Sequence, residues 1–379
     1  MAASDQAPSM LVPTDDEMLQ TQAELWRHTL SYLTSMTLRC AVHLGIPTAI
    51  HRHGGAASLP DLVTALSLPT AKLPFLRRLM RLLVHSGIFA SDDAGTTYRL
   101  TPVSFFLVDG AAAAVPVVDG HLSQVPHVLA STSRHCLDTV AGLAGWFRED
   151  FPAPSPPSPF EHVHGVTPLE STARLGPEDA ALFQEGLRVY DASGFAVVLR
   201  ECRDVFDGVE SLTDCGGGDG TAARAIAEAF PHVKCTVLDL ARVVGDVPAD
   251  GVVEYVAGDM FDFIPPSQAV MLKRIALLVY CKGLLVDVDE DCIKILAQCK
   301  KAVPLQEERG KVIIIDIIVG SDSWPMLESQ LLMDVAVMLV TKGRQRDEND
   351  WRDLFMKVGF RDYKIVKKLG PRCVIEVYP

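Results

Sequence analysis

The sequence predicts an α/β protein in which a parallel sheet carries a nucleotide-type binding loop, with a smaller, mainly helical module before it. Residues 211–239 read as strand, glycine turn, helix, strand and acid, which opens such a domain. Further along, apolar strand patterns alternate with helical patterns, which is typical of a parallel sheet. Before this region, short helical patterns precede a single hairpin pattern.

The loop between Ser211–Cys215 and the alanine-rich stretch Thr221–Ala229 contains consecutive glycines at 216–218. Glycines let a ligand touch main chain where any Cβ would collide. A helix that begins there directs its free N–H groups and positive dipole end toward the ligand. Asp239 follows Gly220 by 19 residues, where such folds place an acid for a ribose. The loose G-x-G-x-x-A match leaves NAD and other adenosine ligands open, and an ordinary loop is the simpler alternative.

Composition excludes several classes of protein. A chain of 379 residues with 48% hydrophobic residues favours two globular domains. The net charge of −13 disfavours binding nucleic acid through the whole surface. The nine cysteines show no C-x-x-C pair or metal spacing, so we expect free thiols and no metal. The sequence shows no secretory signal and no apolar run long enough to cross a membrane, so we expect a cytoplasmic protein with no membrane partner.

The N-terminal region predicts short helices followed by a hairpin, the order of a winged helix. Helical spacing runs from 15 to 50 with a break near Gly45-Ile46-Pro47, and two more helices follow at 59–66 and 71–85. Phe89 and Thr97–Leu100 flank a turn and predict a small β-hairpin. Because the helix at 71–85 is apolar between its basic residues, we favour a dimerisation module over a DNA reader.

The middle of the chain predicts helices on both sides of a proline-rich connector. Residues 111–146 and 177–200 look helical, whereas Phe151–Phe160 contains five prolines in ten residues and predicts an extended segment. We place the domain boundary at residue 110, giving domains 1–110 and 111–379. His162 and His164 are expected in a solvated loop, with a place in a substrate cavity as the alternative.

The C-terminal region predicts the remaining strands and helices of the sheet. Strands are expected at 252–256, 269–273, 311–319, 362–366 and 373–378, and helices at 289–303 and 349–358. The last two strands are separated only by a short turn, so they should form an antiparallel pair at the sheet edge. That ending suits a methyltransferase better than an NAD dehydrogenase.

Several segments resemble the plant class II small-molecule O-methyltransferases, most closely those of grasses, over nearly the whole chain. They are LRRLMRLLVHSGIFA (76–90), DCGGGDG (214–220), FPHVKCTVLDL (230–240), GDMFDFIP (258–265), DEDCIKILAQCKKAVP (289–304), KVIIIDIIVG (311–320) and the ending VIEVYP. The resemblance implies a Rossmann-like fold, a winged-helix-like module that forms a homodimer, the cofactor S-adenosyl-L-methionine, and a small aromatic substrate with a hydroxyl group.

The resemblance also implies site residues. Gly216 and its neighbours would lie against the methionine part of the cofactor, Asp239 would hold the ribose, Asp259 and Met260 would frame the adenine, and Lys273 would reach toward the cofactor. Leu187 and Met333 would contact the substrate, although core packing explains both equally well. Asp219 stands where the family usually has threonine, which adds a negative charge near the cofactor carboxylate.

The family takes the phenolic proton with a histidine, and here that segment is replaced. The histidine would lie between Lys273 and Asp289, but Arg274–Val288 reads RIALLVYCKGLLVDV and contains none. Counting from either side places the position on Leu277 or Leu285. A phenol with a pKa near 10 is a poor nucleophile at pH 7, and a positioned base typically contributes ~10²–10⁴-fold.

Three interpretations stay open: an altered exon boundary, loss of catalysis with retention of binding, or a different base. Asp316 matches the family carboxylate that orients the histidine and is the candidate for the third. The second orienting position is Gln345 instead of glutamate. Our hypothesis is an O-methyltransferase of weak or absent activity, with an inactive dimer partner that binds S-adenosylmethionine or a metabolite as the main alternative and an NAD-dependent oxidoreductase as a distant one.

Overall fold

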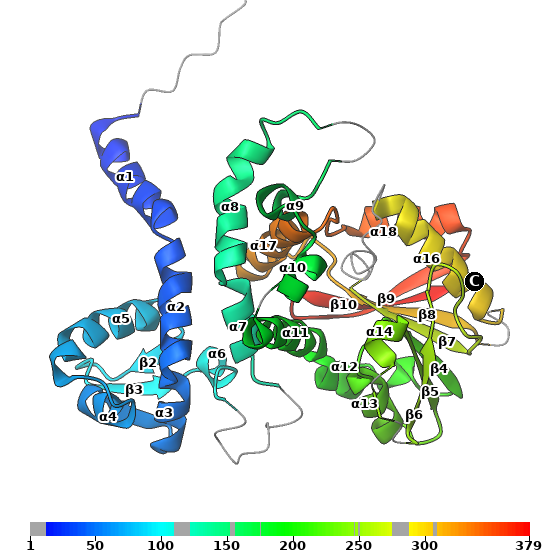
Figure 1. Ribbon diagram of the computed structural model, residues 1–379, viewed down its shortest axis with the longest axis horizontal. Helices are drawn as coiled ribbons and strands as arrows, with labels where there is room; N and C mark the ends of the chain where they lie inside the picture. Colours follow the sequence, from blue (N-terminus) through cyan, green and yellow to red (C-terminus); the bar gives the residue numbers. More distant parts are fainter. Residues whose placement is uncertain are drawn as a thin grey trace, which may run out of the picture. The chain divides into compact units, whose positions relative to one another are not determined.

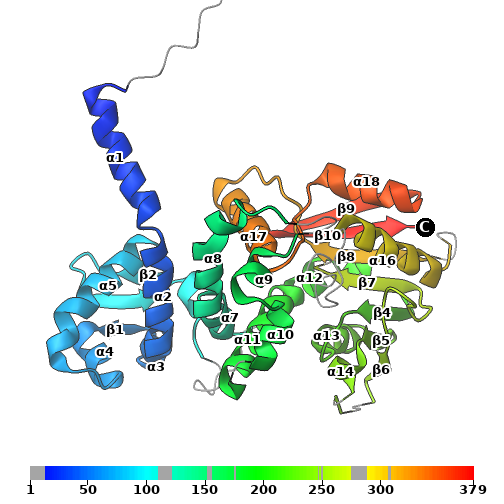
Figure 2. The same ribbon diagram turned by 45° about the horizontal axis from the view of Figure 1, so that its top comes forward.

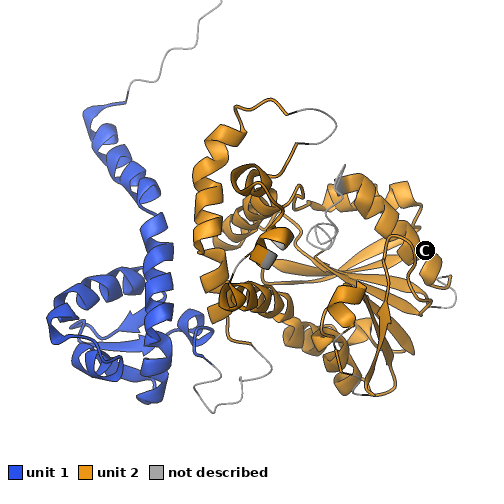
Figure 3. Ribbon diagram, viewed as in Figure 1, with its two compact units in different colours: residues 1–114 blue, residues 115–379 orange. Residues whose placement is uncertain are grey.

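The computed structural model describes residues 13–109, 122–151, 156–174, 176–245, 247–248, 251–274, 288–305 and 309–379. The chain divides into two compact units, residues 1–114 and 115–379 (Figure 3). The boundary predicted at residue 110 falls in the stretch 110–121, outside the described residues, and stays a prediction.

The N-terminal unit is mainly helical. Its helices are α1 (Asp15–Thr29), α2 (Tyr32–Leu44), α3 (Ile46–Arg52), α4 (Leu59–Ala65), α5 (Leu73–His85) and the short α6 (Pro102–Phe105). The predicted break at Gly45 is confirmed: with a φ of 74°, this glycine ends α2 and precedes α3.

A small antiparallel sheet completes this unit, in the order β1-β3-β2 (Figure 1). The predicted hairpin is confirmed as β2 (Phe89–Ser91) paired with β3 (Thr97–Leu100). The sequence analysis missed β1 (Ala56–Ser58), which pairs with β3. Its three residues are alanine and serine, which carry no strand signal of their own.

The apolar residues of α5 serve the unit's own core. Leu76, Met80 and Leu83 are buried, whereas the arginines of α5 face solvent. The expectation that the apolar surface of α5 packs on another chain is therefore wrong for these three residues. On α5, Phe75 stays 61% exposed. Helix α1 exposes more apolar surface, since no residue of it is buried and Leu25 and Trp26 are 61% and 60% exposed.

The C-terminal unit is built on a seven-stranded sheet in the order β6-β5-β4-β7-β8-β10-β9 (Figures 1 and 2). Its strands are β4 (Ser211–Cys215), β5 (Lys234–Asp239), β6 (Val253–Ala257), β7 (Ala269–Lys273), β8 (Lys311–Asp316), β9 (Asp362–Leu369) and β10 (Arg372–Tyr378). Strands β4 to β8 run parallel, and β10 is antiparallel to both neighbours. The predicted antiparallel final pair is confirmed, but β10 lies inside the sheet between β8 and β9.

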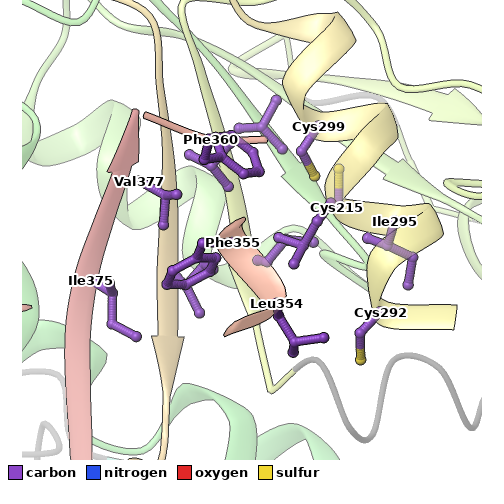
Figure 4. Close-up of a cluster of buried hydrophobic side chains, with 14 of the residues drawn as sticks. Cys215, Cys292, Ile295, Cys299, Leu354, Phe355, Phe360, Ile375 and Val377 are labelled. Carbon is purple, nitrogen blue, oxygen red and sulfur yellow. The ribbon is translucent and has the colours of Figure 1, made fainter. Parts of the chain in front are cut away.

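Helices cover both faces of this sheet, and the strand residues alternate between them. In β8, Val312 and Ile314 join the core under α16 (Val288–Ala302) and α18 (Glu348–Val358), with residues such as Cys299 and Phe355 (Figure 4). Ile313 and Ile315 join the opposite core, under α12 (Phe195–Glu201) and α13 (Thr221–Ala229). A strand buried on both faces reads as a continuous apolar run, which is why KVIIID was recognised from sequence.

Further helices precede or follow these strands: α7 (Val125–Ser131), α8 (Arg134–Trp146), α9 (Pro159–His164), α10 (Pro168–Arg174), α11 (Pro177–Ala192), α14 (Ala241–Val244) and α17 (Trp324–Val340). Helix α7 packs on α11, α8 on α9, and α9 on α17. Within the described ranges, we find no helix that is both long and apolar enough to span a membrane.

The last two residues of the proline-rich connector, Pro159 and Phe160, are helical, so the expectation of an extended segment is wrong for them. Ser158 has an extended backbone, and residues 152–155 lie outside the described structure. Ser158 caps α9 in a capping box with Glu161, and Pro159 takes the first turn, where its missing N–H costs nothing. His162 and His164 therefore lie on a helix and not in a solvated loop. The His164 ring contacts Thr139 Oγ1 and the carbonyl of His135, both at 3.1 Å.

Candidate functional site

The glycine loop joins β4 to α13 and is held by hydrogen bonds to β5, β6 and α13. Gly216 N–H donates to the carbonyl of Leu238 at 2.8 Å, which ties the loop to β5. The Tyr255 hydroxyl donates to the Asp219 carbonyl at 2.7 Å, and Arg224 Nη2 donates to the same oxygen at 2.6 Å. Gly216, Gly218 and Gly220 have φ values of 69°, 59° and 81°, which favour glycine. The loop is thus a fixed backbone surface at the carboxyl edge of the sheet.

Two of these glycines provide a matched pair of substitutions. A Cβ on Gly220 would collide with the Tyr255 hydroxyl, whereas a Cβ on Gly218 would meet nothing within 4 Å. Both alanines carry the left-handed backbone cost of ~1–2 kcal/mol. We expect Gly220→Ala to lower the free energy of unfolding by ~1–3 kcal/mol more than Gly218→Ala, measured by urea denaturation without ligand. Equal losses of unfolding free energy in the two variants would show that the Tyr255 side chain moves aside at no energetic cost.

Beneath the loop lies a buried ion pair. Lys273, the last residue of β7, donates from Nζ to both carboxylate oxygens of Asp214 on β4, at 2.6 and 2.7 Å. The side chain of Asp214 is fully buried, and that of Lys273 is 5% exposed. Burial opposes the charged amine, but the attraction of Asp214 and Asp191 raises the pKa of Lys273 above its ordinary value. The ammonium group predicted to reach toward the cofactor is therefore engaged below the loop.

The two predicted carboxylates lie at the ends of neighbouring strands. Asp239 ends β5 and accepts from the backbone N–H of Gly218 at 3.0 Å and of Leu240 at 2.7 Å. Asp259 follows β6, and its Oδ1 accepts from the N–H of Phe261 at 2.9 Å. The backbone connects them, since the N–H of Gly258 donates to the Asp239 carbonyl at 3.0 Å. Met260 is half-buried against the core under α16.

Asp219 occupies the start of α13. Its Oδ1 accepts from the Thr221 N–H at 2.9 Å and from the Thr221 hydroxyl at 2.7 Å. The sequence analysis expected the first N–H groups of this helix to face a ligand, and for Thr221 this is wrong because Asp219 takes that donor. On α11, Arg188 and Glu185 form an ion pair at 2.6 Å. The negative charge of Asp219 acts on both groups and contributes a rise to the pKa of each.

A half-buried ion pair joins Asp191 of α11 to the arginine that follows β7. Arg274, the first residue after β7, donates from Nε to Asp191 Oδ1 at 2.9 Å, and its Nη2 lies 2.7 Å from the same oxygen. Its guanidinium also lies 4.9 Å from the ring centre of Tyr190. Leu187 lies on the same helix, one turn earlier, and is 38% exposed.

The predicted catalytic carboxylate lies at the end of β8. Asp316 is 3% exposed, and its Oδ1 accepts from the N–H of Ile317 at 2.8 Å. The backbone N–H of Gln345 donates to Asp334 Oδ1 at 2.6 Å. Met333 is half-buried on α17. The positions Leu277 and Leu285 lie outside the described residues.

The neighbouring Arg346 fixes the start of α16. It is 1% exposed, donates from Nη2 to Asp289 at 2.6 Å, and contacts Cys292 at 3.3 Å. Arg344 Nη2 donates to the same Asp289 carboxylate at 3.2 Å. These contacts hold the chain where it re-enters the described structure after residue 287.

The sequence analysis missed side chains that become neighbours only through folding. Tyr255 supports the loop from β6, Asp214 neutralises Lys273, and Tyr190 and His127 lie beside Arg274. The acid before the glycines was a visible signal for Asp214. No local pattern marks Tyr190 or His127.

Comparison with known proteins decides the family. A model of the O-methyltransferase domain matches residues 140–361, and a model of the O-methyltransferase dimerisation domain matches residues 26–110. The chain belongs to the O-methyltransferase family. The first match alone covers more than half of the chain of this O-methyltransferase.

Relatives of this O-methyltransferase occur in grasses. It is 65% identical to a flavonoid O-methyltransferase-like protein of Oryza sativa subsp. japonica, over 99% of each chain. It is 55% identical to probable O-methyltransferase 2 of Sorghum bicolor over 100% of each chain, and 54% identical to daphnetin O-methyltransferase 1 of Secale cereale over 95% of this chain and 99% of that one.

Solved structures share the fold of this O-methyltransferase. The calicheamicin biosynthesis methyltransferase CalO1, in its SAH-bound form, matches with a TM-score of 0.75 and 24% identity over 95% of this chain and 99% of that one. Human N-acetylserotonin methyltransferase in complex with SAM matches with a TM-score of 0.70 and 18% identity over 98% and 99%.

Proposed function

We propose that this protein transfers a methyl group from S-adenosylmethionine to a hydroxyl of a phenolic or related aromatic metabolite. The observation that carries the proposal is the row of groups along one sheet edge: the glycine loop after β4, Asp239 at the end of β5 and Asp259 after β6. In open parallel sheets, ligands bind at the carboxyl ends of the strands. The cofactor supplies an electrophilic methyl group on a sulfonium.

The residues present fit this cofactor. Asp239 uses one lone pair of each oxygen on backbone N–H groups, so the carboxylate still has acceptor capacity for two ribose hydroxyls. Gly216 and Gly218 expose main chain for the methionine part. Asp259 and the half-buried Met260 offer a carboxylate and a soft apolar surface for an adenine.

Lys273 acts in this proposal through Asp214. Because its ammonium is bonded to both Asp214 oxygens, it neutralises a carboxylate that would otherwise lie unpaired under the loop. The pair keeps the end of β7 level with the end of β4. Lys273 is thus a positioning residue for the loop.

The substrate side is assigned to α11 and α17. Leu187 on α11 and Met333 on α17 would contact the aromatic ring. The names of the relatives, which include a daphnetin and a flavonoid-type methyltransferase, favour a phenolic acceptor. Asp316, at the end of β8, stands where the family has the carboxylate that orients the histidine, and it is the catalytic candidate that the sequence offers.

We further propose a homodimer built by the N-terminal unit. The dimerisation model matches residues 26–110, and α1 leaves Leu25 and Trp26 exposed, together with Met18, Leu19 and Leu30. An apolar helix face of this kind is typically covered by a partner.

The experiment combines binding with turnover. We expect S-adenosylmethionine and its demethylated product to raise the melting temperature of the purified protein, and NAD to leave it unchanged. Methyl transfer to a panel of phenols then separates an enzyme from an inactive binding partner. A protein that binds the cofactor but methylates no phenol would be the latter, and a protein stabilised only by NAD would contradict the proposal.

A further inference from the structure

Three side chains meet around Tyr190, near the C-terminal end of α11. The His127 ring from α7 stacks on the tyrosine ring, with centroids 4.8 Å apart and planes 18° apart. The guanidinium groups of Arg274 and Arg372 lie 4.9 and 4.8 Å from the same ring centre. An aromatic ring with an imidazole and two cations around it is a fixed and strongly polarised site.

This Tyr190 cluster lies next to the proposed cofactor site. Arg274 directly follows Lys273, whose ammonium supports the glycine loop, and Asp191, the neighbour of Tyr190, holds Arg274. Burial would raise the pKa of Asp191, but Arg274, Lys273 and Arg372 together lower it. The cluster therefore stands at the end of β7, the strand after which the family places its catalytic histidine.

Arg274 has one donor to spare. It contacts Asp191 through Nε and Nη2, which form one side of the guanidinium, so Nη1 points to the other side. That atom is buried and has no hydrogen-bond partner among the residues that the structure describes. Both terminal nitrogens of Arg372, by contrast, donate to backbone carbonyls, Nη1 to Ser193 at 2.6 Å and Nη2 to Tyr190 at 2.8 Å. A buried cationic donor without an acceptor suits an oxyanion.

The surroundings of His127 favour its neutral form. Burial lowers the pKa of its imidazole below the ordinary 6.5, and the charges of Arg274 and Arg372 lower it further, while a hydrogen-bonding contact with the backbone of Gly186 opposes them. Gly186 lets α7 approach closely, because a Cβ there would lie 2.8 Å from the Ala130 Cβ. A ring N–H directed at a backbone carbonyl leaves the second ring nitrogen as an acceptor.

We propose that His127 takes the proton of the acceptor hydroxyl and that Arg274 Nη1 stabilises the resulting oxyanion, in place of the histidine missing after β7. The inference rests on the function proposed above. The phenol O–H bond breaks and an N–H bond forms on the imidazole. The oxygen electron pair forms the new bond to the methyl group as the S–CH₃ bond breaks, and the imidazolium then releases its proton to solvent.

Asp316 suits this role less well. Its Oδ1 is bonded to the Ile317 N–H, and the side chain is buried at the end of β8. A carboxylate with an ordinary pKa of about 4 lies roughly six units below a phenol, whereas an ordinary imidazole lies roughly four units below. The lowered pKa of His127 widens the second gap. A base with the smaller gap accepts the phenolic proton more readily.

The first test follows the proton directly, without methyl transfer. A phenol whose ionised form absorbs visible light is titrated with pH on protein saturated with S-adenosylhomocysteine. We expect the bound phenol to ionise at a lower pH than in water, and His127→Gln or Arg274→Met to reduce that shift. His232→Gln, an exposed histidine on the turn before β5, is the matched control and should leave it unchanged. A shift that is identical in wild type and His127→Gln would overturn the proposal.

The second test is kinetic. We expect kcat in His127→Gln to fall ~10²–10⁴-fold with unchanged binding of S-adenosylhomocysteine, and the decline of the wild-type rate below pH 6.5 to disappear. His127→Phe keeps the stack on Tyr190 and replaces the glutamine variant if the latter does not fold. Loss of rate in Asp316→Asn with retention in both His127 variants would assign the base to Asp316. A wild-type protein that neither binds the cofactor product nor methylates phenols would refute the proposed function itself.

Discussion

Replacing Lys273 by methionine is expected to lower the free energy of unfolding by ~3–5 kcal/mol, the usual cost of leaving one partner of a buried ion pair alone. The reason is the Asp214 carboxylate, which is fully buried and accepts two hydrogen bonds from Lys273 Nζ. Urea denaturation of the full chain at pH 7, followed by circular dichroism, measures the change.

The matched control is the double variant Asp214→Asn/Lys273→Met. It removes both charges at nearly constant volume, so we expect it to recover most of the lost stability. A double variant as unstable as Lys273→Met alone would mean that packing of the lysine chain, and not the stranded charge, causes the loss.

The pH dependence of this pair has a defined sign. In wild type the raised pKa of Lys273 means that its stabilising contribution is complete below the ordinary lysine pKa and is lost only as pH rises through the raised value. In wild type, burial raises the pKa of Asp214 although the Lys273 ammonium opposes it. In Lys273→Met nothing opposes burial, so we expect this pKa to rise further. The variant should therefore lose stability, relative to wild type, as pH rises through that value.

Asp239→Asn is expected to weaken binding of S-adenosylhomocysteine by about 10–150-fold, as two charge-assisted hydrogen bonds to ribose become neutral ones worth ~1.5–3 kcal/mol less. The asparagine oxygen can keep the bond from the N–H of Gly218, which now reaches Asp239 at 3.0 Å, so the loop keeps this anchor. The amide nitrogen cannot accept from the N–H of Leu240, so that second backbone bond is lost in the variant. Isothermal titration calorimetry on the intact protein measures the dissociation constant.

Asp207→Asn provides the control for the change in net charge, because Asp207 is an exposed aspartate on the turn before β4. It should bind the ligand as wild type does. Equal affinity of Asp239→Asn and wild type would remove the ribose contact from the proposed function. A parallel fall in thermal stability without ligand would instead indicate that Asp239 serves mainly to hold the loop.

The sequence predicted individual elements well because they are encoded locally. The strand Ala269–Lys273 was predicted with its observed ends, since its apolar run stops at a charged residue. The position of β10 between β8 and β9 was not predicted, because it depends on pairing between strands far apart in the chain. The start of α9 was missed because its prolines suggested a connector, while Ser158 and Glu161 supplied the capping signal.

The residues of the candidate site also fall into two groups: those with a local sequence signal, and those that meet only through folding. Asp239 was selected by its spacing after the glycine loop, and Asp259 by the family resemblance. Both follow apolar strand runs, which agrees with the rule that ligands bind at strand ends. The bond between Lys273 and Asp214 joins residues 59 positions apart, and no local pattern reports it. His127 and Tyr190 come from two helices that meet only because Gly186 allows close packing.

Tyr255 connects an edge strand of the sheet to the glycine loop. It lies in β6, which has a neighbour on one side only, and its hydroxyl is one of the groups that fix the carbonyl of Asp219. Edge strands open more readily than central ones in transient local unfolding. Each such opening of β6 would release the loop as well. We therefore expect the lifetime of a ligand bound at the loop to depend in part on how long β6 stays paired with β5.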